Sequence, residues 1–244
     1  MKRLLIVITH IFVILVFSTC KKPGCFGAKG PVTVITRPLA FFKELVLADN
    51  INLVLIQDSI EKMDIEGPQN MLSNVRADIA QNILALSHTT DCRWARDAAE
   101  KINVRLHFKQ LQKIDYQGSG TLTNMDTLKL DALHIESNTG AGDIILTLDN
   151  RYTGAYIFFE NASITLHGKS QICFTYTNNR GIADMSDFVV NKMGIEYGGF
   201  RDTHNNVTDE LSAVIFHKGN IYYKGTPVIT KLISHSTGRL IQAP

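Results

Sequence analysis

The sequence predicts an all-β protein: a single right-handed, β-helix-like solenoid domain behind an export signal and a short tether. Strand-like runs dominate the chain after residue 31, and only two short segments have helical character. Turn-forming tripeptides recur at intervals of about 20 residues in the second half, as in stacked coils. No strand–helix–strand rhythm points to a doubly wound sheet. A sandwich is the alternative, because some turns are only roughly 8 to 12 residues apart.

The chain begins with an export signal. Residues 2–3 are basic, residues 4–17 are apolar, and Ser18 and Thr19 lead to Cys20. This order is typical of a secretory signal peptide, and the apolar run falls short of the about 20 residues that span a bilayer. The small-small-Cys ending resembles a bacterial lipoprotein box, in which the cysteine thiol receives diacylglycerol. We expect lipidation at Cys20; an ordinary secretory signal with a chance cysteine is the alternative.

Three regions follow from this signal. Residues 1–19 are the lipoprotein signal peptide, residues 20–38 a lipid-anchored tether rich in glycine and proline at its start, and residues 39–244 the solenoid domain. Removal of the signal leaves 225 residues, enough for one domain with a sizeable core. It also removes two basic residues, so the formal charge falls from +2 to zero. A near-neutral chain argues against nucleic-acid binding.

Strand and helix signals are unequal in the first half. Ile51–Ile56 is rich in β-branched residues and leucine, and Ile102–Phe108 alternates apolar and polar side chains with period two. Helical character is confined to Pro68–Val75 and Trp94–Lys101. Both segments are short and polar, and short helices are marginal without packing. We therefore expect strands to build the fold.

In the second half, six turn-like tripeptides each lead into an apolar residue. They are Gly118–Gly120 into Leu122, Gly140–Gly142 into Ile144, Asn161–Ser163 into Ile164, Asn179–Gly181 into Ile182, His204–Asn206 into Val207, and Lys218–Asn220 into Ile221. The apolar positions are 22, 20, 18, 25 and 14 residues apart. We expect glycine and asparagine to supply positive φ at the corners of the coils, with the apolar residue pointing inward.

Three cysteines remain beside Cys20 in a compartment that permits disulfides. Since three is odd, at least one thiol stays unpaired within the chain. Cys25 and Cys92 both lie in loop-like contexts, and a disulfide between them is predicted; three separate thiols are the alternative. Cys173 lies in a strand-like run and is expected to be a buried small apolar residue.

No residue pattern predicts a metal or cofactor site. The eight histidines are scattered, without a pair at helical spacing and without a neighbouring cysteine. Stacking on one solenoid face is conceivable for three of them: His107, His134 and His167. We expect these rings to be hydrogen-bonded or solvent-facing instead.

Acidic and aromatic residues are the candidates for a site that binds or cleaves sugars. A hydrolase or lyase on this fold needs converging carboxylates, and the acidic candidates near corners are Asp143, Glu160, Asp184 and Asp187. They form no recognisable motif, so we expect solvated turn residues and no catalytic site. An aromatic set lies in the last third: Tyr197, Phe200, Phe216, Tyr222 and Tyr223. Exposed rings can stack on sugars, but core filling explains this set as readily.

Several stretches, taken in order, resemble a known family. They are Phe42–Gln57, Asn70–Leu72, Asp91–Arg96, Ile114–Gly120, Gly140–Gly142 and Lys218–Pro227. Together they are similar to the head GIN domain of putative auto-transporter adhesins, common in envelope lipoproteins of Bacteroidetes. The resemblance covers about residues 39–240. It implies a β-solenoid and names no firm activity.

The expected function is that of a non-enzymatic, lipid-anchored envelope protein for adhesion, scaffolding or binding. Its expected partners are the membrane, through the lipid, and an envelope protein or glycan; no cofactor is expected. A β-helix carbohydrate-active enzyme, lyase or hydrolase, and a self-assembling spacer are the alternatives. Surface-exported lipoproteins of this phylum resemble one another in acidic residues after the lipidated cysteine. Lys21 and Lys22 are basic, which favours an outer-membrane lipoprotein facing the periplasm.

Two tripeptides resemble an O-glycosylation site of exported Bacteroidetes proteins. Asp58–Ile60 would be modified at Ser59, and Asp126–Leu128 at Thr127. Matches of three residues arise easily by chance, so both remain hypotheses.

Overall fold

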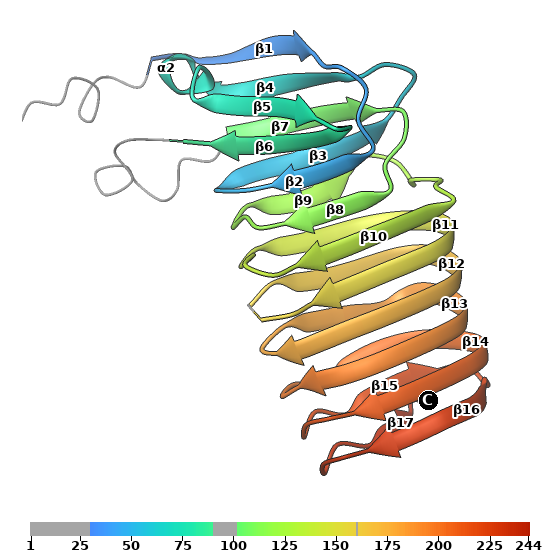
Figure 1. Ribbon diagram of the computed structural model, residues 1–244. Coiled ribbons are helices and arrows are strands. Elements are labelled where there is room, and N and C mark those ends of the chain that lie inside the picture. Colours follow the sequence, from blue (N-terminus) through green and yellow to red (C-terminus); the bar gives the residue numbers. More distant parts are fainter. Residues whose placement is uncertain (1–29, 90–101, 160) are drawn as a thin grey trace, which may run out of the picture.

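The computed structural model describes residues 30–89, 102–159 and 161–244. Its strands stack into an elongated β-solenoid (Figure 1), which confirms the predicted class and excludes the sandwich. From β8 to β16 the chain crosses the near side leftward and the far side rightward as it descends, so the coil is right-handed. Among the described residues the one helix is α2 (Gln69–Leu72), inside the predicted Pro68–Val75 segment. The predicted helix at Trp94–Lys101 lies wholly outside the described residues.

Seventeen strands are defined in the described residues. They are β1 (Val32–Pro38), β2 (Glu44–Leu47), β3 (Ile51–Gln57), β4 (Lys62–Pro68), β5 (Val75–Ala80), β6 (Ile83–His88), β7 (Ile102–Phe108), β8 (Lys113–Tyr116), β9 (Thr121–Asn124), β10 (Ala132–Ser137), β11 (Asp143–Ile157), β12 (Ser163–Asn179), β13 (Ile182–Gly199), β14 (Thr203–Ile215), β15 (Ile221–Lys224), β16 (Val228–Ser234) and β17 (Leu240–Gln242).

Each coil contributes to two facing parallel sheets. The β10 sheet contains β2, β6, β8, β10, the second halves of β11 to β14, and β16. The β9 sheet contains β3, β7, β9, the first halves of β11 to β14, β15 and β17. The long strands bend from one sheet into the other. Residues 20 positions apart become neighbours, as Ile144 and Ile164 or Tyr156 and Tyr176 do.

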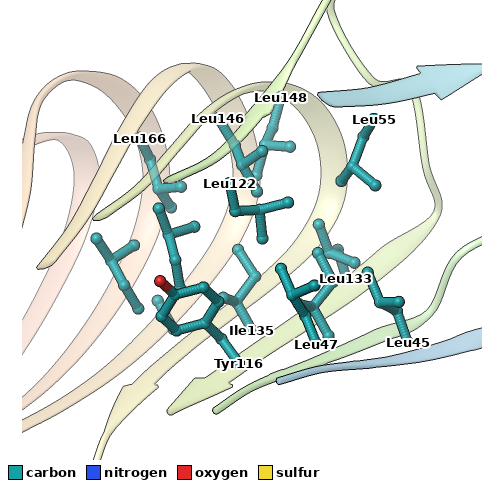
Figure 2. Close-up of a cluster of buried hydrophobic side chains, with 14 of the residues drawn as sticks. Leu45, Leu47, Leu55, Tyr116, Leu122, Leu133, Ile135, Leu146, Leu148 and Leu166 are labelled. Atoms are coloured by element: carbon teal, nitrogen blue, oxygen red, sulfur yellow. The ribbon is translucent and has the colours of Figure 1, made fainter. Parts of the chain in front are cut away.

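The core fills the space between the sheets with alternate side chains of every strand. In β11 the side chains of Ile144, Leu146 and Leu148 are fully buried, whereas Ile145 between them is 39% exposed. Figure 2 shows leucines from several coils meeting in this layer, with the Tyr116 ring among them. The Tyr116 hydroxyl donates to the carbonyl of Gly120, so the one polar atom of the ring is paired.

Five of the six predicted corners lie where one strand ends and the next begins, and the sixth is wrong. His204–Asn206 lies inside β14, because the chain turns earlier, between β13 and Thr203. Thr203 is inward and buried, and its hydroxyl donates to the Ala183 carbonyl at 2.5 Å. Because this inward residue is polar, the pattern of apolar residues in the sequence does not mark it, which explains the irregular spacings before and after Val207. Ile182 is also not the inward residue of its coil, since Ala183 aligns with Ile164.

The corner glycines serve close packing. Positive φ at a predicted corner occurs at Asn179, with φ 55°, so the expectation is confirmed there. It is wrong at the Gly-x-Gly corners, because the described glycines with positive φ are Gly30, Gly168 and Gly225. A Cβ added to Gly120 would overlap the Ile51 carbonyl of the neighbouring coil, and one added to Gly142 would overlap the Gly120 carbonyl. These positions exclude a side chain because successive coils touch there.

The two ends of the solenoid differ. Antiparallel strands β1, β4 and β5 extend the two sheets at the N-terminal end. Residues 32–38 therefore form part of the fold, and the tether boundary predicted at residue 38 lies too late. At the C-terminal end every residue of β16 is exposed, including Leu232 at 52%. No helix in the described ranges has the length and apolar character needed to cross a bilayer.

A charged cluster ties the N-terminal strands together. The His107 ring contacts Asp58 through Nδ1 at 2.8 Å and Asp64 through Nε2 at 3.4 Å. Asp64 also accepts a hydrogen bond from the Thr36 hydroxyl at 2.5 Å, which links β1 to β4. The bond from His107 lowers the pKa of Asp58, and the bond from Thr36 lowers the pKa of Asp64.

Acidification is expected to destabilise these strands. A carboxyl whose folded pKa lies below its unfolded value of about 3.9 stabilises the fold above that pH and loses this contribution as pH falls further. We expect the melting temperature to decrease once the pH falls below about 4. Circular dichroism at a series of pH values from neutral to acidic measures this decrease. The double substitution Asp58→Asn and Asp64→Asn should flatten this pH dependence. An unchanged acid slope in that variant would contradict the assignment.

Candidate functional site

Aromatic side chains gather on the outer surface of the β10 sheet. We name this set the aromatic platform; its members are His134, Tyr152, Tyr156, Phe158, Phe174 and Tyr176. They come from β10, from β11 and the residue after it, and from β12. All six are partly exposed, in contrast to the buried side chains that alternate with them.

Strand alternation and register create this surface. In β11, Thr153, Ala155 and Ile157 point inward and are buried, so Tyr152 and Tyr156 must point outward. The parallel register then places Tyr156 beside Tyr176 of the next coil. Aromatic residues that are separated by 20 positions in the chain thus form contiguous rows on one face.

The rings contact one another in a continuous network. His134 and Tyr156 have centroids 6.3 Å apart and planes only 8° from parallel, and Tyr156 and Phe158 are 6.2 Å apart at 9°. Phe174 lies 6.0 Å from Tyr156, and Tyr176 lies 5.3 Å from Phe158. Such aromatic pairs stabilise by about 0.5–1.5 kcal/mol beyond burial, which holds the rings in place.

Two glycines make room for the rings. A Cβ at Gly154 would lie 2.6 Å from Tyr156 Cε2 and 3.0 Å from His134 Nδ1. A Cβ at Gly194 would lie 2.9 Å from Phe174 Cδ2. The Tyr156 and Phe174 rings therefore lean over bare backbone, and any larger residue at these glycines would displace them.

Polar groups border the platform. The hydroxyls of Tyr152 and Tyr156 are 3.3 Å apart, and burial together with this contact raises the pKa of Tyr156, which keeps the phenol neutral. Ion pairs lie on either side: Lys113 Nζ is 2.5 Å from Glu136 Oε1, and Lys192 Nζ is 2.6 Å from Glu210 Oε1. A shallow depression of about 400 Å³ runs from the tyrosines across Gly194 to Glu210.

The acidic candidates are not gathered into one group. Asp143 accepts a hydrogen bond from the Ser163 hydroxyl at 2.7 Å, and Asp184 accepts one from the backbone N–H of Ser186 at 3.0 Å. Asp187 lies 3.9 Å from His167 and is exposed. Glu160 lies outside the described residues. Each of the three described carboxylates thus has its own neighbour on the β9 sheet.

The three histidines lie apart. His107 belongs to the N-terminal charged cluster and His167 to the β9 sheet, whereas His134 belongs to the aromatic platform. The expectation of hydrogen-bonded or solvent-facing rings is confirmed. In the part of the chain that the structure describes, no three His, Cys, Asp or Glu side chains are placed to hold a metal ion.

The modification candidates divide between described and undescribed residues. Cys173 is buried, and burial raises the pKa of its thiol to about 12, so its predicted role as a small apolar residue is confirmed. Ser59 and Thr127 are both exposed, as an acceptor hydroxyl must be. Cys20, and the predicted pair of Cys25 and Cys92, lie outside the described residues.

The aromatic set of the last third does not form one surface. Tyr197 is buried, Tyr222 stacks on His204 on the β9 sheet, and Phe200 and Phe216 contact His217 and His235 respectively. Sequence reasoning missed the platform instead. A signal was present, since the i, i+2 aromatic pairs Tyr156/Phe158 and Phe174/Tyr176 recur at nearly one coil's distance.

Comparison with known proteins agrees with this architecture. The family described as putative auto-transporter adhesin, head GIN domain, matches residues 41–227. The chain belongs to this family. A search of curated protein sequences returned no match.

Solved structures share the head GIN fold at low identity. A putative adhesin from Bacteroides fragilis superposes with a TM-score of 0.75 at 20% identity, over 87% of this chain and 97% of its own. A putative adhesin from Parabacteroides distasonis gives 0.66 at 16%, over 88% and 98%. A protein from the same organism described as a putative lipid binding protein gives 0.65 at 15%, also over 88% and 98%. At these identities the likeness establishes the fold alone.

Proposed function

We propose that this head GIN protein is a non-enzymatic, lipid-anchored module of the cell envelope that binds its partner through the aromatic platform. The observation that carries the proposal is the platform itself. Six aromatic side chains point away from the buried core between the sheets, and the glycines beneath Tyr156 and Phe174 leave room for these two rings. Exposed apolar patches of this kind mark interaction sites. The family description, an adhesin, supports a binding role.

Anchoring follows from the start of the chain. Acyl chains on Cys20 would hold the protein at a membrane, because each buried CH₂ contributes about 0.8 kcal/mol and several chains make release negligible. The basic Lys21 and Lys22 favour the periplasmic side of the outer membrane. The solenoid would then stand at the membrane as a stiff body with the platform on one side.

The two alternatives have weaker support. An enzyme would need converging carboxylates, and Asp143, Asp184 and Asp187 each engage a different neighbour. End-to-end assembly of two copies is favoured by the exposed edge of β16, since unpaired strand edges are templates for pairing. A single monomeric species in sedimentation at high concentration would exclude that second function.

Metabolic labelling and crosslinking in cells test the proposal. Incorporation of a clickable fatty acid is expected in the wild type and in Cys25→Ser and is expected to be lost in Cys20→Ser. A photo-crosslinking amino acid at Ile172, which borders the platform and is 40% exposed, should give adducts. The same amino acid at Ile145, 39% exposed on the β9 sheet, is the matched control. Fatty-acid label on the Cys20→Ser variant would refute lipid anchoring at Cys20. Equal amounts of crosslinked adduct at Ile172 and Ile145 would refute binding through the aromatic platform.

Protease treatment of intact and lysed cells decides the membrane face. Protection until lysis is expected for a periplasmic protein. Cleavage on intact cells would contradict the orientation inferred from Lys21 and Lys22 and would place the platform at the cell surface.

A further inference from the structure

We infer that the aromatic platform takes an uncharged polysaccharide, with sugar rings stacked on Tyr156, Phe158 and Phe174. This inference rests on the proposed function and adds the chemical class of the ligand. It is drawn from three features of the platform: the arrangement of its rings, the backbone beneath them, and the paired charges around them.

The arrangement of the rings suits a chain of sugars. His134, Tyr156 and Phe158 form a row with centroids 6.3 and 6.2 Å apart and planes within 9° of parallel. A pyranose ring has an apolar face of C–H groups and a rim of hydroxyls. All three rings are partly exposed, so apolar faces of a polysaccharide can contact the surface that they leave open, while the phenol hydroxyls of Tyr152 and Tyr156 meet the sugar rim.

The backbone beneath the rings makes the surface preformed. Tyr156 leans over Gly154 and Phe174 leans over Gly194, and each ring also contacts other rings. Side chains that are already ordered lose little rotamer freedom on binding. A shallow, rigid surface with this property can gain affinity from a few stacked sugars although it encloses no deep pocket.

The charges around the platform select against a polyanion, and Glu196, next to a platform tyrosine in the register, adds a further carboxylate there. Lys113 is paired with Glu136 at 2.5 Å and Lys192 with Glu210 at 2.6 Å, so a polyanion finds both of these lysines already neutralised. A protein partner would have to cover these ion pairs, and desolvating them is unfavourable. Sugar hydroxyls can instead donate to the carboxylates and accept from the ammonium groups while both remain hydrated.

Affinity electrophoresis of the mature lipoprotein in Triton X-100 tests the inference, with deoxycholate added to the micelles to carry a chain of zero formal charge through the gel. Native gels are cast with laminarin, galactomannan, arabinoxylan or dextran as neutral probes, and with polygalacturonate as the charged probe. Retardation is expected in at least one neutral gel. Phe174→Ala should raise the dissociation constant in that gel about ten-fold or more, and Gly194→Val, which displaces the same ring, should also weaken binding.

Tyr222→Ala is the matched control, because Tyr222 is a half-buried outward ring of the β9 sheet. It should bind as the wild type does. Melting temperatures of all variants establish that each one is folded. Absence of retardation in every neutral gel, or retardation by polygalacturonate alone, overturns the inference; so does equal binding by wild type and Phe174→Ala. If these gels fail while Ile172 crosslinks to a protein, the proposed binding role stands and only the ligand class is refuted.

Discussion

Replacement of Leu146 by alanine is expected to lower the free energy of unfolding by about 3 kcal/mol. Leu146 is fully buried between the two sheets, where Figure 2 shows it beside Leu122 and Leu148. It is paired in register with Leu166 of the next coil. Because the coils on both sides hold the backbone in place, the cavity left by the substitution cannot close completely. The variant therefore loses the transfer free energy of the removed atoms and also incurs the cost of the cavity.

Thermal unfolding followed by circular dichroism measures this effect. For a domain of this size about 3 kcal/mol corresponds to roughly 6–12 °C in melting temperature. Ile145→Ala is the matched control, since Ile145 is the next residue of the same strand and points to solvent. The expected shift in melting temperature for Ile145→Ala is about a third of the shift for Leu146→Ala or less. Equal shifts for the two variants would contradict the inward and outward assignment of β11.

Gly142→Ala is expected to destabilise the protein by about 3 kcal/mol, although it adds only one methyl group. The added Cβ would overlap the Tyr116 hydroxyl oxygen and the Gly120 carbonyl oxygen, and would lie 2.9 Å from the Ser119 carbonyl carbon. Most of these atoms are backbone atoms of the neighbouring coil, so no side chain can swing away to relieve the clash. Coils must separate at this corner, and the added Cβ also overlaps both oxygens of the bond from Tyr116 to Gly120, which lies within the neighbouring coil.

Gly194→Ala separates this cause from a general effect of losing glycine. Its Cβ would meet the Phe174 ring at 2.9 Å and the Ser212 hydroxyl at 3.5 Å, both of them side-chain atoms at the surface. The ring can move outward, so a change in melting temperature of only a few degrees is expected, against roughly 6–12 °C for Gly142→Ala. Equal decreases in melting temperature for the two variants would contradict close contact between coils as the reason for glycine in the Gly140–Gly142 corner.

Much of the fold was predictable because its signals are local. Period-two alternation identifies Ile102–Phe108 as a strand, and glycine-rich corners mark where Gly118–Gly120 and Gly140–Gly142 end one strand and begin the next. The corner at His204–Asn206 failed because the inward residue is Thr203. Its hydroxyl is satisfied by Ala183, a partner 20 residues away that no local pattern reveals.

The candidate site was hidden from the sequence for a related reason. For the aromatic residues close in sequence, Tyr197 to Tyr223, the sequence left open a sugar-binding surface or core filling. Strand alternation places Tyr197 in the core and Tyr222 outside on the β9 sheet, so they form no single surface. The platform joins residues that the chain keeps about one coil apart. The sequence alone also does not show which ring each glycine of the platform accommodates.

The amino-acid sequence by itself determined the all-β class, the coil-like repeat and the family, since each rests on local periodicity, turn chemistry and the order of short motifs. Only the tertiary structure decided which outward side chains meet. Phe174 lies between Gly154 and Gly194 because the parallel register aligns three successive coils. That register depends on inward packing and on backbone contact at the corners, which are interactions between residues some 20 positions apart rather than properties of any one segment.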